Sequence, residues 1–187
     1  MRALLLGLVV LAGCLLPNPP PPPRYFAPDV PAAQDAHGPV RVRLGIVRSP
    51  INLRESITWR RSEVEYGFYE QRRWTELPST YVDRALHREL FPAGGPVPVS
   101  GDVPVLTAEV RAFEEILAPP VHEARVAVAV TVADDRCIWL RRTFEATRPL
   151  SGDDPDALAR AIGESMDDVT RTTGDAVRKA LSGRCGR

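Results

Sequence analysis

Arg125-Val126-Ala127-Val128-Ala129-Val130-Thr131-Val132 is the stretch of this chain with the most regular pattern. Its valines occupy every second position, and this alternation predicts a β-strand with one face buried against a core. The other face carries Ala127, Ala129 and Thr131, which are small enough for a helix or another chain to approach closely. We therefore expect the fold to be built around a sheet that contains this strand.

The same kind of alternation predicts strands elsewhere in the chain. Two of them flank the stretch, with apolar residues at Leu106, Ala108, Val110 and Ala112 and at Ile138, Leu140, Phe144 and Ala146. An earlier strand is expected, with one face formed by Val40, Val42, Leu44 and Ile46. Residues 57–59 and 64–68 are separated by Arg60-Arg61-Ser62, and this spacing predicts a hairpin.

Two helices are predicted from the spacing of apolar residues. The first is introduced by Pro78, with Thr80 and Asp83 at capping-box spacing. Its buried face should consist of Val82, Ala85, Leu86 and Leu90. The second begins after Asp153-Asp154-Pro155 and ends at Gly183. The element order predicts an α+β domain over residues 40–187, with a mostly antiparallel sheet of about five to six strands packed with two main helices.

The N-terminus has the pattern of a bacterial lipoprotein signal. Arg2 precedes an apolar run, and Leu11-Ala12-Gly13 leads directly to Cys14. Residues 1–13 are therefore predicted to be removed and Cys14 to be lipidated. A membrane-spanning helix needs about 20 apolar residues, and Pro17 ends this run before that length. Because Leu15 rather than Asp follows the cysteine, the outer membrane is the expected location, with the protein facing the periplasm.

Residues 14–39 are predicted to be a lipidated cysteine followed by a proline-rich tether. Their composition shows no apolar periodicity, and Pro19-Pro20-Pro21-Pro22-Pro23 favours a stiff, extended spacer. At about 3.1 Å per residue, a fully extended segment 15–39 would reach ~75 Å. A folded domain attached to it would stand clear of the membrane.

Composition excludes some classes of function. The chain has 187 residues, with 24 Lys+Arg against 24 Asp+Glu, and no basic patch predicts nucleic-acid binding. If Cys14 is acylated, Cys137 and Cys185 remain as a candidate disulfide in an oxidising compartment. The alternative is that one of these thiols is buried and the other is exposed.

The sequence contains no recognisable catalytic, cofactor or metal motif. Its histidines are scattered at His37, His87 and His122, and His87 is expected on a helix surface. The acidic pairs are expected at turns or on a polar helix face, where carboxylates are solvated: Glu114-Glu115, Asp134-Asp135 and Asp167-Asp168. Arg73 and Trp74 are candidates for contacting a partner or ligand, and packing in the core is the alternative for Trp74.

Three short motifs give the chain a family resemblance. They are Ile57-Thr58-Trp59-Arg60, Arg73-Trp74-Thr75-Glu76 and Phe113-Glu114, which follow the lipobox and precede a C-terminal amphipathic helix. In this arrangement the chain resembles the ABC-type transport auxiliary lipoproteins, a family that includes the paraquat-inducible protein C type. The resemblance spans roughly residues 40–182. The chain departs from the family pattern at Thr75 and at Leu77-Pro78.

The resemblance implies a non-enzymatic partner of an MCE-type ABC system for lipid or solvent transport. Such a protein would contact the MCE and transporter subunits and bind the membrane through Cys14, without a cofactor. Three alternatives remain open at this point. They are a lipoprotein that regulates peptidoglycan synthesis, a structural envelope lipoprotein, and an envelope enzyme with an unfamiliar site.

Overall fold

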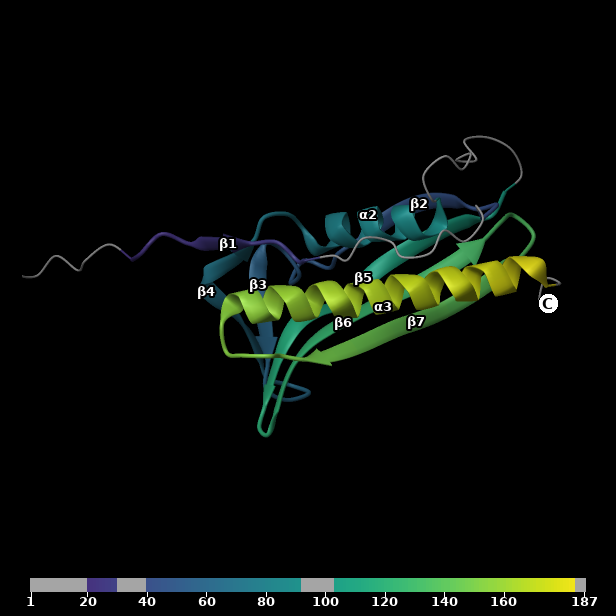
Figure 1. The fold of residues 1–187 in the computed structure, drawn as a ribbon. Helices are drawn as coiled ribbons and strands as arrows, with labels where there is room; N and C mark the ends of the chain where they lie inside the picture. Colours follow the sequence, from purple (N-terminus) through teal and green to yellow (C-terminus); the bar gives the residue numbers. More distant parts are fainter. Residues whose placement is uncertain (1–19, 30–39, 92–102, 184–187) are drawn as a thin grey trace, which may run out of the picture.

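The computed structural model describes residues 20–29, 40–91 and 103–183, drawn in colour in Figure 1. Its centre is the long antiparallel hairpin of β5 (Val105–Ala118) and β6 (Val121–Ala133). All four alternating valines of β6 are at most 1% exposed, so the predicted strand and its buried face are confirmed. An irregularity between Val110 and Ala112 shifts the register of β5.

The predicted α+β class with two main helices is confirmed, but the sheet is mixed rather than mostly antiparallel. In the described residues it has seven strands, one more than the upper estimate. The main order is β1 (Arg24–Phe26), β4 (Tyr66–Trp74), β3 (Ser56–Arg60), β5, β6 and β7 (Ile138–Pro149), and β2 (Arg43–Arg48) also pairs with β5. The pairs β1·β4, β2·β5 and β3·β5 are parallel. After β4, which is antiparallel to β3, the chain passes through a helix and re-enters the sheet as β5 on the other side of β3. This crossover connection makes β5 run parallel to β3.

The additional strand, β1, lies in the segment that we predicted to be tether. Phe26 is buried, and its carbonyl oxygen accepts a hydrogen bond of 2.9 Å from the Thr75 amide. Beyond β1, the Asp29 amide donates to the Ala159 carbonyl at 3.3 Å. A Cβ atom at Gly163 would lie 1.8 Å from the Asp29 carbonyl oxygen, which shows how closely the two backbones approach. Residues 24–29 therefore belong to the folded domain, and its predicted start at residue 40 is too late.

Strand β2 departs from the predicted alternation. Val40 and Val42 are buried as expected, but Ile46 is 61% exposed. The register with β5 shifts between Leu44 and Val47, and Val47 packs against the core instead. The irregularity turns the strand over, because a shift of one residue exchanges the two faces.

The two helices are α2 (Pro78–Leu90) and α3 (Pro155–Ser182). The predicted apolar face of α2 is buried, but its N-cap is Leu77 without a side-chain hydrogen bond, so the predicted Thr80–Asp83 capping box is wrong. In α3 the prediction is confirmed: the Asp154 carboxylate accepts from the Ala157 amide at 2.8 Å, and Gly183 is the C-cap.

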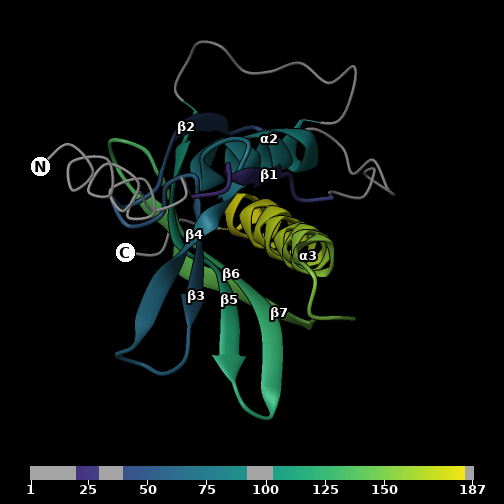
Figure 2. The same cartoon turned by 90° about the vertical axis from the view of Figure 1, so that its left-hand side faces the viewer.

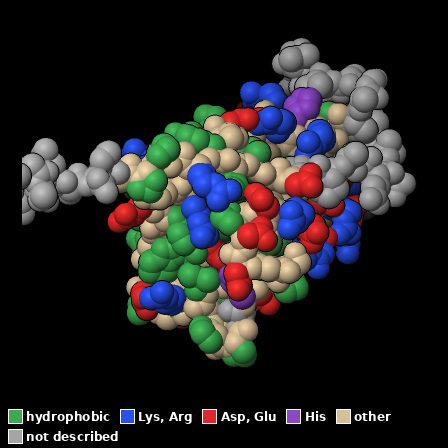
Figure 3. Space-filling model, turned by 60° about the vertical axis from the view of Figure 1, so that its left-hand side comes forward, with side chains coloured by type: hydrophobic (Ala, Val, Ile, Leu, Met, Phe, Trp, Pro, Cys, Tyr) green, Lys and Arg blue, Asp and Glu red, His purple; other side chains and the backbone are tan. Residues whose placement is uncertain are grey.

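Both helices lie on the same side of the sheet, as Figure 2 shows. We call this the inner face and the opposite side the outer face. The core lies between the inner face and the helices, and its largest fully buried side chains include Trp74, Phe113, Ile57, Leu86, Leu158, Ile162 and Met166. The ends of the β3–β4 and β5–β6 hairpins extend past the start of α3 (Figure 2). On the side drawn in Figure 3, basic and acidic side chains are intermixed.

Candidate functional site

One group of ionisable side chains around a buried carboxylate lies between the two hairpin ends, beside the start of α3. Glu115 of β5 is at its centre and is only 3% exposed. The Tyr69 hydroxyl donates a hydrogen bond to Glu115 Oε2 at 2.7 Å, and His122 Nε2 lies 2.5 Å from Glu115 Oε1. His122 Nδ1 is 3.1 Å from Asp153 Oδ1, just before α3. One chain of polar contacts thus joins strands β4, β5 and β6 to the residues just before α3.

The environment of Tyr69 keeps its hydroxyl protonated. Burial raises the pKa of Tyr69, and the hydrogen bond to Glu115 raises it further because an ionised phenol would face a carboxylate. The Arg72 guanidinium lies over the Tyr69 ring, 4.3 Å from its centroid, and its charge acts in the opposite direction. Tyr69 therefore acts as a hydrogen-bond donor and is unsuited to be a base.

These residues form one wall of a pocket of about 670 Å³. Its lining combines the polar chain with Arg61, Arg72 and the apolar Leu117, Pro119 and Pro120. Both Glu115 oxygens are already engaged by Tyr69 and His122. No serine, threonine, cysteine or lysine is among its described lining residues. The pocket is thus equipped for binding a small polar group or a side chain.

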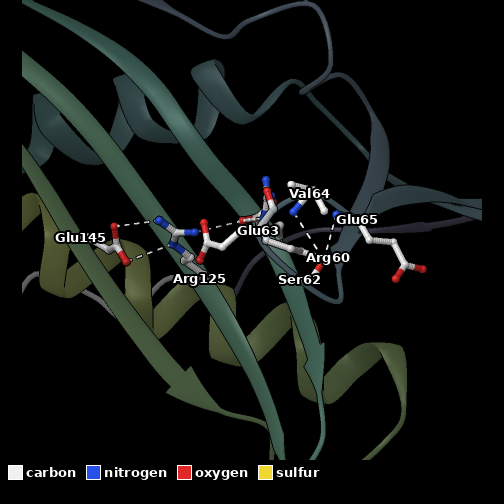
Figure 4. A network of polar contacts seen from close by, with 8 residues as sticks. Arg60, Ser62, Glu63, Val64, Glu65, Arg125 and Glu145 are labelled. Atoms are coloured by element: carbon white, nitrogen blue, oxygen red, sulfur yellow. Dashed lines mark hydrogen bonds and ion pairs between the residues drawn. The ribbon is translucent and has the colours of Figure 1, made fainter.

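A second polar network lies on the outer face, around Glu114. This side chain is 2% exposed and is paired with Arg60 Nε at 2.8 Å and with Arg125 Nη1 at 3.5 Å. Figure 4 shows Arg125 reaching to Glu145 on the neighbouring strand and Arg60 beside the hairpin turn. Both oxygens of Glu145 accept from Arg125 at 3.0 Å, and this hydrogen bonding raises the pKa of Arg125. Arg125 is therefore fixed as a cation between two carboxylates.

The burial of Glu114 and Glu115 corrects the prediction that this acidic pair lies at a turn and is solvated. Strand β5 continues through both residues to Ala118. The hairpin then turns at Pro119-Pro120 and pairs Leu117 with His122, which brings His122 beside Glu115. We missed this cluster because β5 was predicted to end too early. The Pro-Pro step between two apolar runs was the available signal for a longer hairpin.

Neither of the two predicted contact residues lies on an open binding surface. Trp74 is 1% exposed and packs edge-on against Phe113 with the ring centroids 5.4 Å apart. Trp74 is therefore a core residue, which confirms the alternative given for it over a contact with a partner. Arg73 is half-buried and donates to Ser56 Oγ at 2.9 Å. This bond joins the two strands of the β3–β4 hairpin.

The three motifs behind the family resemblance meet in space. Arg60 of the first motif pairs with Glu114 of the third, and Trp74 of the second packs on Phe113 of the third. The motifs are therefore contact partners at the junction of β3, β4 and β5. Their role in this structure is to hold the two hairpins together.

The remaining predicted site residues lie in other places. Cys137 is disulfide-bonded, and Cys185 lies outside the described residues, so their pairing stays a prediction. Cys14 and His37 also lie outside the described residues. His87 is exposed on α2, as predicted, with its ring centroid 5.2 Å from that of Phe91.

Within the described ranges, no three His, Cys, Asp or Glu side chains are grouped so that they could hold a metal ion. The helices in those same ranges are not long and apolar enough to cross a membrane.

Solved structures share this fold at low sequence identity. Protein XCC0632 from Xanthomonas campestris superposes with a TM-score of 0.71 at 20% identity, covering 85% of this chain and 97% of that chain. An uncharacterized protein gives a TM-score of 0.66 at 13% identity, with 84% and 99% covered. The hypothetical protein CT253 from Chlamydia trachomatis gives 0.51 at 11% identity, with 79% and 100% covered. At these identities the comparison establishes the fold alone.

A comparison with curated protein sequences finds no match. The model of one family, described as the ABC-type transport auxiliary lipoprotein component, matches residues 26–173. This range covers more than half of the chain and begins in β1, in agreement with the corrected domain start. The chain therefore belongs to the family of ABC-type transport auxiliary lipoprotein components.

Proposed function

We propose that this protein is a non-catalytic component of an MCE-type ABC system that moves lipid or solvent molecules across the cell envelope. The family match over residues 26–173 is the observation that carries the proposal. The lining of the hairpin pocket is consistent with it, because the buried carboxylate of Glu115 is already paired and the described lining contains no serine, threonine, cysteine or lysine. In this role the domain needs no cofactor or metal, and it works by binding the MCE and transporter subunits.

We further propose that lipidated Cys14 anchors the domain to the outer membrane on its periplasmic side. Stable attachment needs two or more acyl chains, which a fully modified lipoprotein cysteine supplies. Because residues 24–29 belong to the domain, the tether is residues 15–23. At about 3.1 Å per residue these would span ~28 Å when extended. The domain thus remains much closer to the membrane than the full segment 15–39 would allow.

Affinity purification of the intact, lipidated protein from solubilised envelopes at native expression tests the proposed partners. The expected result is that the permease, the ATPase and an MCE subunit copurify. An unrelated outer-membrane lipoprotein with the same tag is the control for carry-over of membrane fragments. Recovery of none of the three subunits would reject the proposal, and recovery of a peptidoglycan synthase in their place would favour the alternative of a cell-wall regulator.

A further inference from the structure

A second hollow lies on the outer face, at the opposite end of β5 from the hairpin pocket. It has a volume of about 720 Å³ and is lined by residues of β2, β5, β6 and β7. The strand register places its outward side chains in two rows across the sheet: Arg48, Glu109, Ala129 and Thr143 in one, and Thr107, Thr131 and Arg141 in the next. We call this hollow the outer groove. Its floor is made of small side chains, so a partner's backbone can approach the sheet closely.

The outer groove is strongly cationic in a chain whose total charge is balanced. Three arginines, Arg48, Arg111 and Arg141, and one glutamate line it from the outer side, whereas the whole chain has 24 basic and 24 acidic residues. Arg142 pairs with the buried Val130 and its guanidinium lies over the Phe144 ring, so its side chain belongs to the inner side. The glutamate is already paired, because Glu109 lies 3.0 Å from Arg111. In the described part of the chain, Arg48 and Arg141 have no carboxylate partner. Guanidinium groups without a carboxylate partner can bind a carboxylate of another molecule with paired hydrogen bonds.

The width of the groove suits one polypeptide segment. Arg48 on β2 and Arg141 on β7 stand three strand spacings apart, and a spacing of about 4.8 Å makes this distance ~14 Å. An α-helix with its side chains is about 10–12 Å across. A helix or a strand would therefore fit between the two arginines, with acidic side chains reaching both.

The complementary acidic segment must come from another molecule. The parts of this chain outside the described ranges contain only two acidic residues, Asp35 and Asp102. A membrane surface fits less well, because Ile46 is the only exposed large hydrophobic side chain in the lining.

We infer that the outer groove is a docking site for an acidic segment of a partner protein. The inference rests on the lining of the groove and not on the proposed transport role, so either can fail without the other.

Binding of a fluorescein-labelled, helix-forming Glu/Ala peptide to the full chain in detergent tests this inference by fluorescence anisotropy. The double variant Arg48→Gln/Arg141→Gln should bind about tenfold more weakly, because it loses two charge contacts. The matched control is Arg88→Gln/Arg160→Gln, which removes two exposed, unpaired arginines from α2 and α3 on the other side of the molecule. It should leave binding unchanged, and a Gln/Ala peptide should not bind.

A floor substitution separates docking in the groove from general attraction between charges. Ala129→Trp fills the groove without changing its charge and should abolish binding of the Glu/Ala peptide. If Ala129→Trp lowers the melting temperature, Thr131→Glu tests the same floor by repulsion. Equal weakening in the two double variants would overturn the inference. So would peptide binding that survives the floor substitutions, or its complete displacement by micelles containing phosphatidylglycerol.

Discussion

Glu114 shows how a single buried charge organises the outer face. Its carboxylate is almost inaccessible and is held by Arg60 and Arg125, whose side chains are 24% and 32% exposed. A buried carboxylate is tolerated only when such partners offset the loss of hydration. In turn, Arg125 links this pair to Glu145 on β7. One residue thus couples three strands of the sheet.

Removing the charge of Glu114 should therefore destabilise the domain. We expect Glu114→Gln to lower the free energy of unfolding by about 1–3 kcal/mol, less than for a fully buried pair because both arginines reach solvent. Glu145→Gln removes the more exposed partner of the same arginine and should cost less than about 1 kcal/mol. Urea unfolding of both variants measures this difference. Equal losses would show that the burial of Glu114 has no special effect.

Asp134 gives a residue-level prediction about pH. The hydrogen bond from the Trp139 indole, followed by that from the Arg136 amide, lowers the pKa of Asp134 below its ordinary 3.8. A lowered pKa in the folded state means that the ionised form stabilises the fold above the ordinary pKa. This contribution is lost as the pH falls through the lowered pKa. Asp134→Asn should therefore melt at a lower temperature than the wild type at neutral pH, and the gap should close in strong acid.

The acidic pair Glu114-Glu115 also shows what the sequence did not reveal at this scale. Neighbouring carboxylates are usually solvated, and nothing in their local pattern distinguishes them from Asp167-Asp168. Their burial depends on Arg60, Tyr69 and His122, which are brought there by strand pairing. Such pairing between distant segments cannot be read from periodicity.

At the scale of elements, long periodic segments were predicted well and short ones were not. Strand β6 and helix α3 have enough alternations or turns to fix their faces, and in β5 the predicted face holds as far as Val110, where the register shifts. Strand β1 has only three residues, follows a run of prolines and shows no alternation. The parallel pairing of β3 with β5 was missed as well, because local pattern does not say where a chain returns after a helix.

The contact between Gly163 and Asp29 makes the docking of β1 testable. Gly163→Ala places a methyl group against the Asp29 backbone, so β1 should detach more often and release the Arg24 backbone from its pairing with β4, which lets trypsin cleave there. Faster cleavage after Arg24, followed by mass spectrometry, is the expected result. Gly183→Ala is the control, because a Cβ atom there would meet its nearest neighbour, the Ala180 carbonyl oxygen, at 3.4 Å. Indistinguishable cleavage rates in the two variants would show that this contact does not hold β1.

A disulfide between Cys137 and Cys185 would tie the β6–β7 turn to the chain after α3. We expect a linked peptide containing both cysteines in a non-reducing digest of protein isolated from the envelope. Reduction should lower stability by about 3–4 kcal/mol, because the bond closes a long loop in the unfolded chain. Alkylation of both thiols without a reductant would exclude the pair.

The whole molecule combines a sheet with one covered face and a predicted N-terminal anchor signal. The family and the α+β class could be recognised from the lipobox, three short motifs and the element order. The mixed topology, the position of β1 and the outer groove required the structure. Placing residues 24–29 in the fold shortens the predicted tether, so under the proposed function the position of the domain depends more strongly on the proposed anchor at Cys14.

The central claim is that this domain acts without catalysis and only when it is tethered to the membrane. The most direct measurement is rescue of a strain that lacks the gene, scored by its resistance to lipophilic solvents and detergents. The wild type is compared with a soluble Cys14→Ala form exported to the periplasm by a cleavable signal and confirmed there by its melting curve. The account predicts that the wild type restores resistance and that the folded, soluble form does not. Full rescue by the soluble form would contradict it.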